Sequence, residues 1–207
     1  MYKIIYNFSL SLPCKIKTQL IVYKNILFIF FTFIINPAKA WQDVANKESG
    51  VLNSNTYAYV LLGFTSLFAF IGSVIHADEF NWQSGIKEAS LLFISLFIGI
   101  YLSTFVVRIM HEHTCKTPIS FNQGIEFTIY SFSCVFLINM AGELIRDIFY
   151  IQIIALYTIY IVWEGCTNYL SIPNNKRTLF VLCTSGTIIL SPIIIRYLMV
   201  ILMPGME

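Results

Sequence analysis

Five apolar stretches constrain this chain more than any other feature of its sequence. A helix needs about 20 mostly apolar residues to cross the roughly 30 Å of hydrocarbon in a bilayer. Stretches of this kind, separated by short polar segments, lie at residues 56–75, 89–107, 127–142, 148–163 and 178–203. Short connections make neighbouring spans antiparallel. The sequence therefore predicts an all-α polytopic membrane protein, a bundle of five transmembrane helices.

The composition argues against a water-soluble domain. Of the 207 residues, 57% are apolar and 12% are charged, which is about half the charged fraction of a typical soluble domain. The net charge is only +2, and the basic residues are scattered between apolar blocks. A nucleic-acid-binding surface needs a concentrated basic patch. The partner that the composition indicates is the lipid bilayer, not nucleic acid.

The segment FTFIINPAKAWQDV, residues 31–44, allows two incompatible interpretations. The apolar run at residues 25–35 has only 11 residues, too few to span a bilayer, and it precedes Ala38-Lys39-Ala40. A short apolar run before small residues spaced in this way is typical of a cleaved signal peptide. Cleavage after Ala40 would place every later loop on the opposite side of the membrane.

The second interpretation makes this segment the start of a short helix that precedes the bundle. Asn36 is then the N-cap and Pro37 the first helical residue. Residues 1–36 form an N-terminal extension with a short interfacial apolar segment, and residues 37–205 form the membrane domain. We expect Trp41 to anchor the helix among lipid headgroups, where its amphipathic ring is favoured. The alternative is a connector packed on the bundle.

The distribution of basic residues favours the uncut chain. Lysine and arginine concentrate on the cytoplasmic side of membrane proteins. With a cytoplasmic N-terminus and five spans, three basic residues face outward: Lys87, Arg146 and Arg196. Ten face the cytoplasm: Lys3, Lys15, Lys17, Lys24, Lys39, Lys47, Arg108, Lys116, Lys176 and Arg177. We therefore expect a cytoplasmic N-terminus and a C-terminus outside.

Ionisable side chains inside the spans are the candidate functional residues. Each costs about 2.5–3.5 kcal/mol on insertion scales, so it needs a partner or a purpose. Arg196 lies in the outer half of the fifth span, and Glu143 and Asp147 flank the outer turn between the third and fourth spans. We predict an ion pair of Arg196 with Glu143 or Asp147. Snorkelling of Arg196 to the interface and substrate binding are the alternatives.

A second polar layer is expected at the cytoplasmic ends of the spans. Arg108 ends the second span, and Glu126 and Glu164 lie near the inner ends of the third and fourth. These residues either cap the bundle or line a cytoplasmic cavity, and capping is favoured because residues near the interface reach water.

No pattern in the sequence indicates a metal, a cofactor or an enzyme. In HEHTC, residues 111–115, only His111 and Cys115 share a helical face, and the HExxH spacing of zinc hydrolases is absent. The five cysteines show no CxxC spacing and are expected to be buried apolar residues. We expect no catalytic, cofactor or metal residues.

From Pro37 onward the chain resembles the Yip family of Rab/Ypt-interacting membrane proteins, and more closely its bacterial branch. The resemblance covers residues 37–203 and rests on NPAKAWQDV at 36–44, FNQGIEFTIYS at 121–131, YTIYIVWEG at 157–165 and IPNNKR at 172–177. It implies five helices, a cytoplasmic N-terminus, a bacterial inner (plasma) membrane and no catalytic residues. Eukaryotic members bind small prenylated GTPases. A proline expected after Ser131 is absent, where Phe132 stands.

Three functions compete on these observations. The first is a non-enzymatic protein that organises or binds partners, other membrane proteins or further copies of itself, within the membrane. The second is a small transporter or channel subunit, because Pro192 and Arg196 in one span resemble the broken helices and buried charge of substrate sites. The third, the least favoured, is an enzyme acting on lipid.

Overall fold

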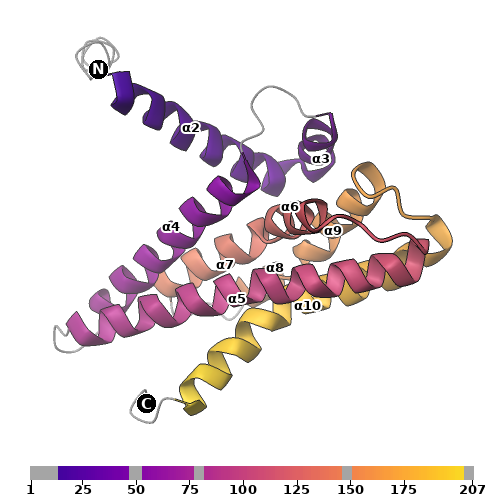
Figure 1. The fold of residues 1–207 in the computed structure, drawn as a ribbon. Coiled ribbons are helices and arrows are strands. Elements are labelled where there is room, and N and C mark those ends of the chain that lie inside the picture. The colour runs from indigo at the N-terminus through magenta and orange to yellow at the C-terminus, as the bar shows by residue number, and fades with distance from the viewer. Residues whose placement is uncertain (1–13, 47–52, 77–81, 146–150, 203–207) are drawn as a thin grey trace.

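The computed structural model is a helical bundle in which successive long helices run in opposite directions (Figure 1). It describes residues 14–46, 53–76, 82–145 and 151–202. Two helices precede the bundle, and the others form it: α2 (Cys14–Ile35), α3 (Pro37–Ala45), α4 (Ser54–Ile75), α5 (Trp82–Cys115), α6 (Phe121–Ser131), α7 (Ser133–Leu144), α8 (Ile151–Ile154), α9 (Tyr157–Asn168) and α10 (Asn174–Leu202).

Four helical segments of the described chain are long and apolar enough to cross a membrane. They are Ser54–Ile75, Trp82–Cys115, Phe121–Leu144 and Asn174–Leu202. The third joins α6 and α7, between which the helix is interrupted at Phe132. No proline causes this interruption; Ser133 Oγ donates instead to the Tyr130 carbonyl oxygen at 2.6 Å, satisfying an acceptor near the break. The predicted first, second, third and fifth spans are confirmed as long apolar helices.

The fourth predicted span, residues 148–163, is not one continuous helix. The described part from residue 151 forms α8 and α9, which are separated by a turn at Ala155 and Leu156. Around this turn, the backbone N–H groups of Leu156 and Thr158 donate to carbonyls three residues earlier, and Cys134 Sγ lies 3.4 Å from the Ile154 carbonyl oxygen, to which it donates. These bonds satisfy polar backbone groups that a break would otherwise leave unpaired.

The amino-terminal apolar helix is longer than its apolar run. The helix α2 has 22 residues, of which Val22–Ile35 form the apolar part. It ends before Asn36, whose side-chain oxygen accepts from the Lys39 backbone N–H at 3.2 Å. Pro37 begins α3. The prediction of an Asn36 N-cap followed by a proline at the first helical position is confirmed.

The core at the α3 end of the bundle is a cluster of aromatic rings around Trp41. The Trp41 ring stacks on Phe127, with ring centroids 5.2 Å apart, and meets Phe33 edge-on at 5.1 Å. Its indole N–H donates to the Ile161 carbonyl oxygen at 2.9 Å. Phe33 in turn stacks on Tyr130. The cluster thus joins α2, α3, α6 and α9.

This burial corrects the prediction that Trp41 lies among lipid headgroups. Trp41 is 0% exposed, so its ring contacts protein on every side and its polar N–H finds a partner inside the bundle. The helix α3 is amphipathic, with Pro37, Ala40, Trp41 and Val44 buried on one face. That face packs on α9, and the alternative of a connector packed on the bundle describes α3 better.

Replacing Gly165 with alanine should destabilise the protein, because the aromatic cluster leaves no room there. A Cβ at Gly165 would lie 2.7 Å from ring atoms of both Phe127 and Trp41. We expect Gly165→Ala to lower the free energy of unfolding by about 1–3 kcal/mol, the usual cost of overpacking, measured by thermal unfolding in detergent. Gly186→Ala is the control, since nothing lies within 4 Å of its added Cβ. Equal stability of the two variants would contradict this packing.

Candidate functional site

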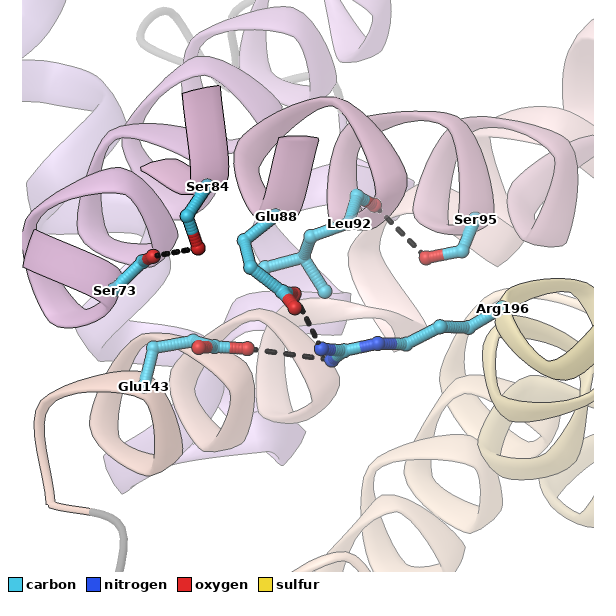
Figure 2. Close-up of polar contacts among 7 residues, drawn as sticks. All are labelled: Ser73, Ser84, Glu88, Leu92, Ser95, Glu143 and Arg196. Carbon is cyan, nitrogen blue, oxygen red and sulfur yellow. Dashed lines mark hydrogen bonds and ion pairs between the residues drawn. The ribbon is translucent and has the colours of Figure 1, made fainter. Parts of the chain in front are cut away.

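The side chain of Arg196 lies between two carboxylates at one end of the bundle (Figure 2). Its Nη2 atom is 2.7 Å from Glu88 Oε2, and its Nη1 atom is 3.3 Å from Glu143 Oε1. The three side chains come from α10, α5 and α7, so this charged cluster joins three helices. Asp147, the other predicted partner, lies outside the described residues.

The position of the charged cluster along the helices follows from helix geometry. Arg177 and Arg196 are 19 residues apart on α10, which at a rise of 1.5 Å per residue is about 28 Å. Glu88 and Arg108 are 20 residues apart on α5, or about 30 Å. Both lengths equal the thickness of bilayer hydrocarbon, about 30 Å. The charged cluster therefore lies one hydrocarbon thickness away from the opposite polar end.

Small side chains let the helices approach closely beside the charged cluster. A Cβ on Gly72 would collide with the Glu143 carbonyl oxygen, so only glycine lets α4 and α7 come this near. Ser73 and Ser84 hydrogen-bond at 3.3 Å between α4 and α5 (Figure 2). The carboxylate of Glu143 is consequently held on a backbone that is itself fixed against α4.

The charged cluster contains one guanidinium and two carboxylates. When all three groups are ionised its formal charge is −1, and each carboxylate takes a different Nη atom of Arg196. The Arg196 side chain is 38% exposed, against 15% for Glu143. Arg196 therefore reaches the surface of the bundle while it contacts the carboxylates.

A cavity of about 720 Å³ adjoins the charged cluster between α5, α7, α10 and the turn after α8. Arg196, Tyr197, Asn139 and Ser95 supply its polar lining. Most of the wall is apolar, and includes Leu92, Val135, Ile138, Ala155, Ile189 and Ile193. A mostly apolar concavity with a few polar groups at one side is the usual form of a ligand site.

Pro192 does not break the helix that carries Arg196. The helix α10 runs without interruption from Asn174 to Leu202. Pro192 is buried where α10 crosses α5, and a Cβ added at Gly99 would lie 3.1 Å from Pro192 Cγ. Ser191 Oγ is 3.1 Å from Ser103 Oγ in the same contact. The broken helix on which the transporter interpretation depended is therefore absent from this described segment.

Arg108, Glu126 and Glu164, the predicted cytoplasmic layer, make separate contacts. The Arg108 guanidinium lies over the Phe121 ring at 5.7 Å from its centroid. Glu126 accepts from the Tyr169 hydroxyl at 2.7 Å, and Glu164 accepts from Asn168 Nδ2 at 3.0 Å. Within the described ranges no ion pair joins these three residues.

Tyr169, just after α9, hydrogen-bonds to Glu126 on α6. Burial, followed by the hydrogen bond to the carboxylate, raises the pKa of Tyr169 well above its ordinary value. The bond also links the end of α9 to α6. Capping of this end of the bundle by Arg108, Glu126 and Glu164 stays a prediction.

The histidine-rich segment after Arg108 is not arranged for a metal. His111 is buried and its Nδ1 atom is 3.0 Å from the Thr117 carbonyl oxygen. Among residues 14–46, 53–76, 82–145 and 151–202, no group of three His, Cys, Asp or Glu side chains is placed to hold a metal ion.

Glu88 is the site residue that the sequence analysis missed. It was placed outside the second span, because the apolar run begins at Ala89. The helix α5 begins earlier, at Trp82, and Glu88 is therefore inside it. The interval of about one hydrocarbon thickness between Glu88 and Arg108, which matches that between Arg177 and Arg196, is the sequence signal that could have identified it.

A comparison with known protein families gives one match, to the Yip1 domain, over residues 31–195. The match begins within α2, spans the bundle and ends at Ile195, one residue before Arg196. A search of curated proteins found no match, and neither did a search of solved structures.

Double-mutant cycles should show that Arg196 is coupled to both carboxylates. Arg196→Met combined with Glu88→Gln, and separately with Glu143→Gln, should destabilise by less than the sum of the single changes. The expected coupling energies are about 0.5–3 kcal/mol, with the larger value for the shorter Glu88 contact. The measurement is thermal unfolding in detergent. Arg196→Met with Glu164→Gln is the control and should be additive; additivity in all three cycles would contradict the pairing.

Proposed function

We propose that this chain, which belongs to the Yip1 domain family, acts within the membrane by binding other membrane components. The family is one of non-enzymatic membrane proteins. Four described helical segments are long and apolar enough to cross a bilayer. The chain is therefore an integral, multi-pass membrane protein. Its five crossings, its orientation and its binding of partners are the proposal.

The five crossings are formed by α4, α5, the pair α6–α7, the pair α8–α9, and α10. The helices α8 and α9 have 4 and 12 residues, which at 1.5 Å per residue extend about 6 and 18 Å. Irregular backbone is tolerated at membrane depth where protein covers it. At the α8–α9 break the Cys134 thiol donates to the Ile154 carbonyl oxygen, while the side chains of Ile153, Ile154 and Leu156 are 55%, 48% and 59% exposed. The described part of this return begins beside α7, where Cys134 near the start of α7 contacts Ile154 at the end of α8, and α9 leads on to α10.

The end opposite the charged cluster faces the cytoplasm in this proposal. Arg108, Lys116, Lys176 and Arg177 are near it, and Lys176 Nζ donates to the Thr114 carbonyl oxygen at 3.0 Å, which brings the ends of α5 and α10 together. The basic side chains thus meet at one end, as the positive-inside rule requires. The resemblance to bacterial members supports the inner membrane as the location.

One observation carries the proposed function. The charged cluster and the opposite end, where Arg108 and Arg177 lie, form two charged levels, and the surface of the helices between them is apolar and largely exposed. Phe105 on α5 is 60% exposed, Tyr59 on α4 is 54% exposed and Leu190 on α10 is 53% exposed. An apolar surface of this extent requires lipid or a membrane partner around it. The surface fits lateral binding of other membrane proteins or of further copies of the chain.

The orientation predicts which reagents reach each end of the chain. Cys115 is half-buried at the end of α5 and should react with a membrane-impermeant maleimide only after the cytoplasmic side is opened. A reporter that is active only outside the cytoplasm should be active when it is fused after Glu207. Cys183 is exposed on α10 but lies between the charged levels, so it should stay unlabelled in intact membranes. Labelling of Cys115 from outside would contradict the orientation.

Crosslinking within the membrane tests partner binding. A photoreactive residue at Phe105 should give discrete protein adducts in native membranes, because this position is 60% exposed. The matched control is Leu96 on the same helix, which is 0% exposed and should give none. Adducts with lipid only, from Phe105 and from positions on the other crossings, would contradict partner binding.

A further inference from the structure

We propose that the cavity beside the charged cluster holds one acyl chain of a phospholipid whose headgroup carries an ammonium group. This inference rests on the proposed crossings, which put the cavity in the outer half of the bilayer, and it goes beyond the proposed binding of protein partners. Three observations carry it: the depth of the cavity, its lining and the charge at its outer side.

The cavity begins at the charged level and extends into the hydrocarbon. Arg196 lines it at the outer side, and Ser95 on α5 lies seven residues inward of Glu88, about 10 Å along the helix. Val135 on α7 lies eight residues inward of Glu143, about 12 Å. Half of the hydrocarbon is about 15 Å thick. The cavity therefore follows one leaflet inward from its headgroup boundary, as an acyl chain does.

The lining favours a hydrocarbon chain over water. Ser95 Oγ donates to the Leu92 carbonyl oxygen at 2.9 Å, and Asn139 Nδ2 donates to the Val135 carbonyl oxygen at 2.8 Å. Ser95 Oγ and Asn139 Nδ2 thus each donate to a carbonyl oxygen of their own helix, and the rest of the inner wall is aliphatic. A buried water needs two to four polar partners. An unfilled cavity would lose the dispersion contacts of its walls.

The cavity reaches the surface of the bundle, so a lipid chain can enter it from the side. Ile193 and Tyr197 line it and are 60% and 67% exposed. Its volume of about 720 Å³ falls within the ~300–1,000 Å³ of ordinary ligand pockets. Lipid surrounds this face in the proposed arrangement, and no other apolar molecule is present at a comparable concentration.

The charged cluster selects the headgroup. Its two carboxylates exceed its single guanidinium by one formal charge, so the outer side of the cavity attracts a cation. The ammonium of phosphatidylethanolamine supplies one, whereas phosphatidylglycerol brings only a negative charge. We therefore expect phosphatidylethanolamine to bind more tightly than phosphatidylglycerol. Neutralising Glu88 should reduce this preference, because it removes the excess charge.

Native mass spectrometry of the delipidated full chain, titrated with each lipid, tests the inference. The unaltered chain should bind one phosphatidylethanolamine more tightly than any later one. Ile193→Trp should weaken this first binding on the order of tenfold, because the indole fills the cavity. Ile194→Trp is the matched control on α10, 51% exposed and outside the cavity lining, and should have no effect. Ala155→Leu fills the cavity from another element if the first variant fails to fold.

The headgroup is tested with a second pair of variants. Glu88→Gln should bring the affinities for the two lipids together, while Glu112→Gln, at the other end of α5, should leave their ratio unchanged. Equal binding by the Ile193 and Ile194 variants, or tighter binding of phosphatidylglycerol to the unaltered chain, would overturn the inference. The proposed function fails by other readouts, namely the labelling side of Cys115 and the absence of protein adducts at Phe105.

Discussion

The distance between two sets of charged side chains is the constraint on which the rest of this structure depends. Hydrocarbon cannot solvate a charge, so charged groups on a crossing helix must lie near the boundaries or find partners. On α5 and α10 they are about 28–30 Å apart. Arg196 has such partners in the charged cluster, where two carboxylates lie within reach of its guanidinium.

The packing of the helices depends on close approach at small residues as well as on polar contacts such as that of Ser103 with Ser191. Gly72 brings α4 against α7, and Gly165 admits the rings of Trp41 and Phe127. Helices in a membrane gain little from the hydrophobic effect, so van der Waals contact at small residues must supply much of their association. The aromatic cluster extends this packing to α2 and α3. It thereby joins the amino-terminal helices to the bundle.

Hydropathy correctly predicted the helices that have long apolar runs. It failed where contacts between helices determine the local structure. The α8–α9 break carries no proline or glycine, and a contact from Cys134, on α7, accompanies it. The apolar run at residues 148–163 therefore looked like one span. Trp41 was wrongly predicted to lie among lipid headgroups, because a tryptophan beside an apolar helix is common both at membrane interfaces and in protein cores. Glu88 was missed because an apolar run marks where hydrocarbon begins, whereas the helix begins earlier.

Depth measurements along α10 test the central claim most directly. Spin labels at exposed positions, Leu179, Leu182, Leu190, Ile194 and Ile201, report whether oxygen or a water-soluble nickel complex reaches each site. The account predicts the highest oxygen accessibility at Leu182 and Leu190, which lie five residues from Arg177 and six from Arg196, with nickel access rising toward Leu179 and beyond Arg196 at Ile201. Nickel access at Leu190 equal to that at Ile201 would show that the charged levels do not mark the boundaries of the hydrocarbon.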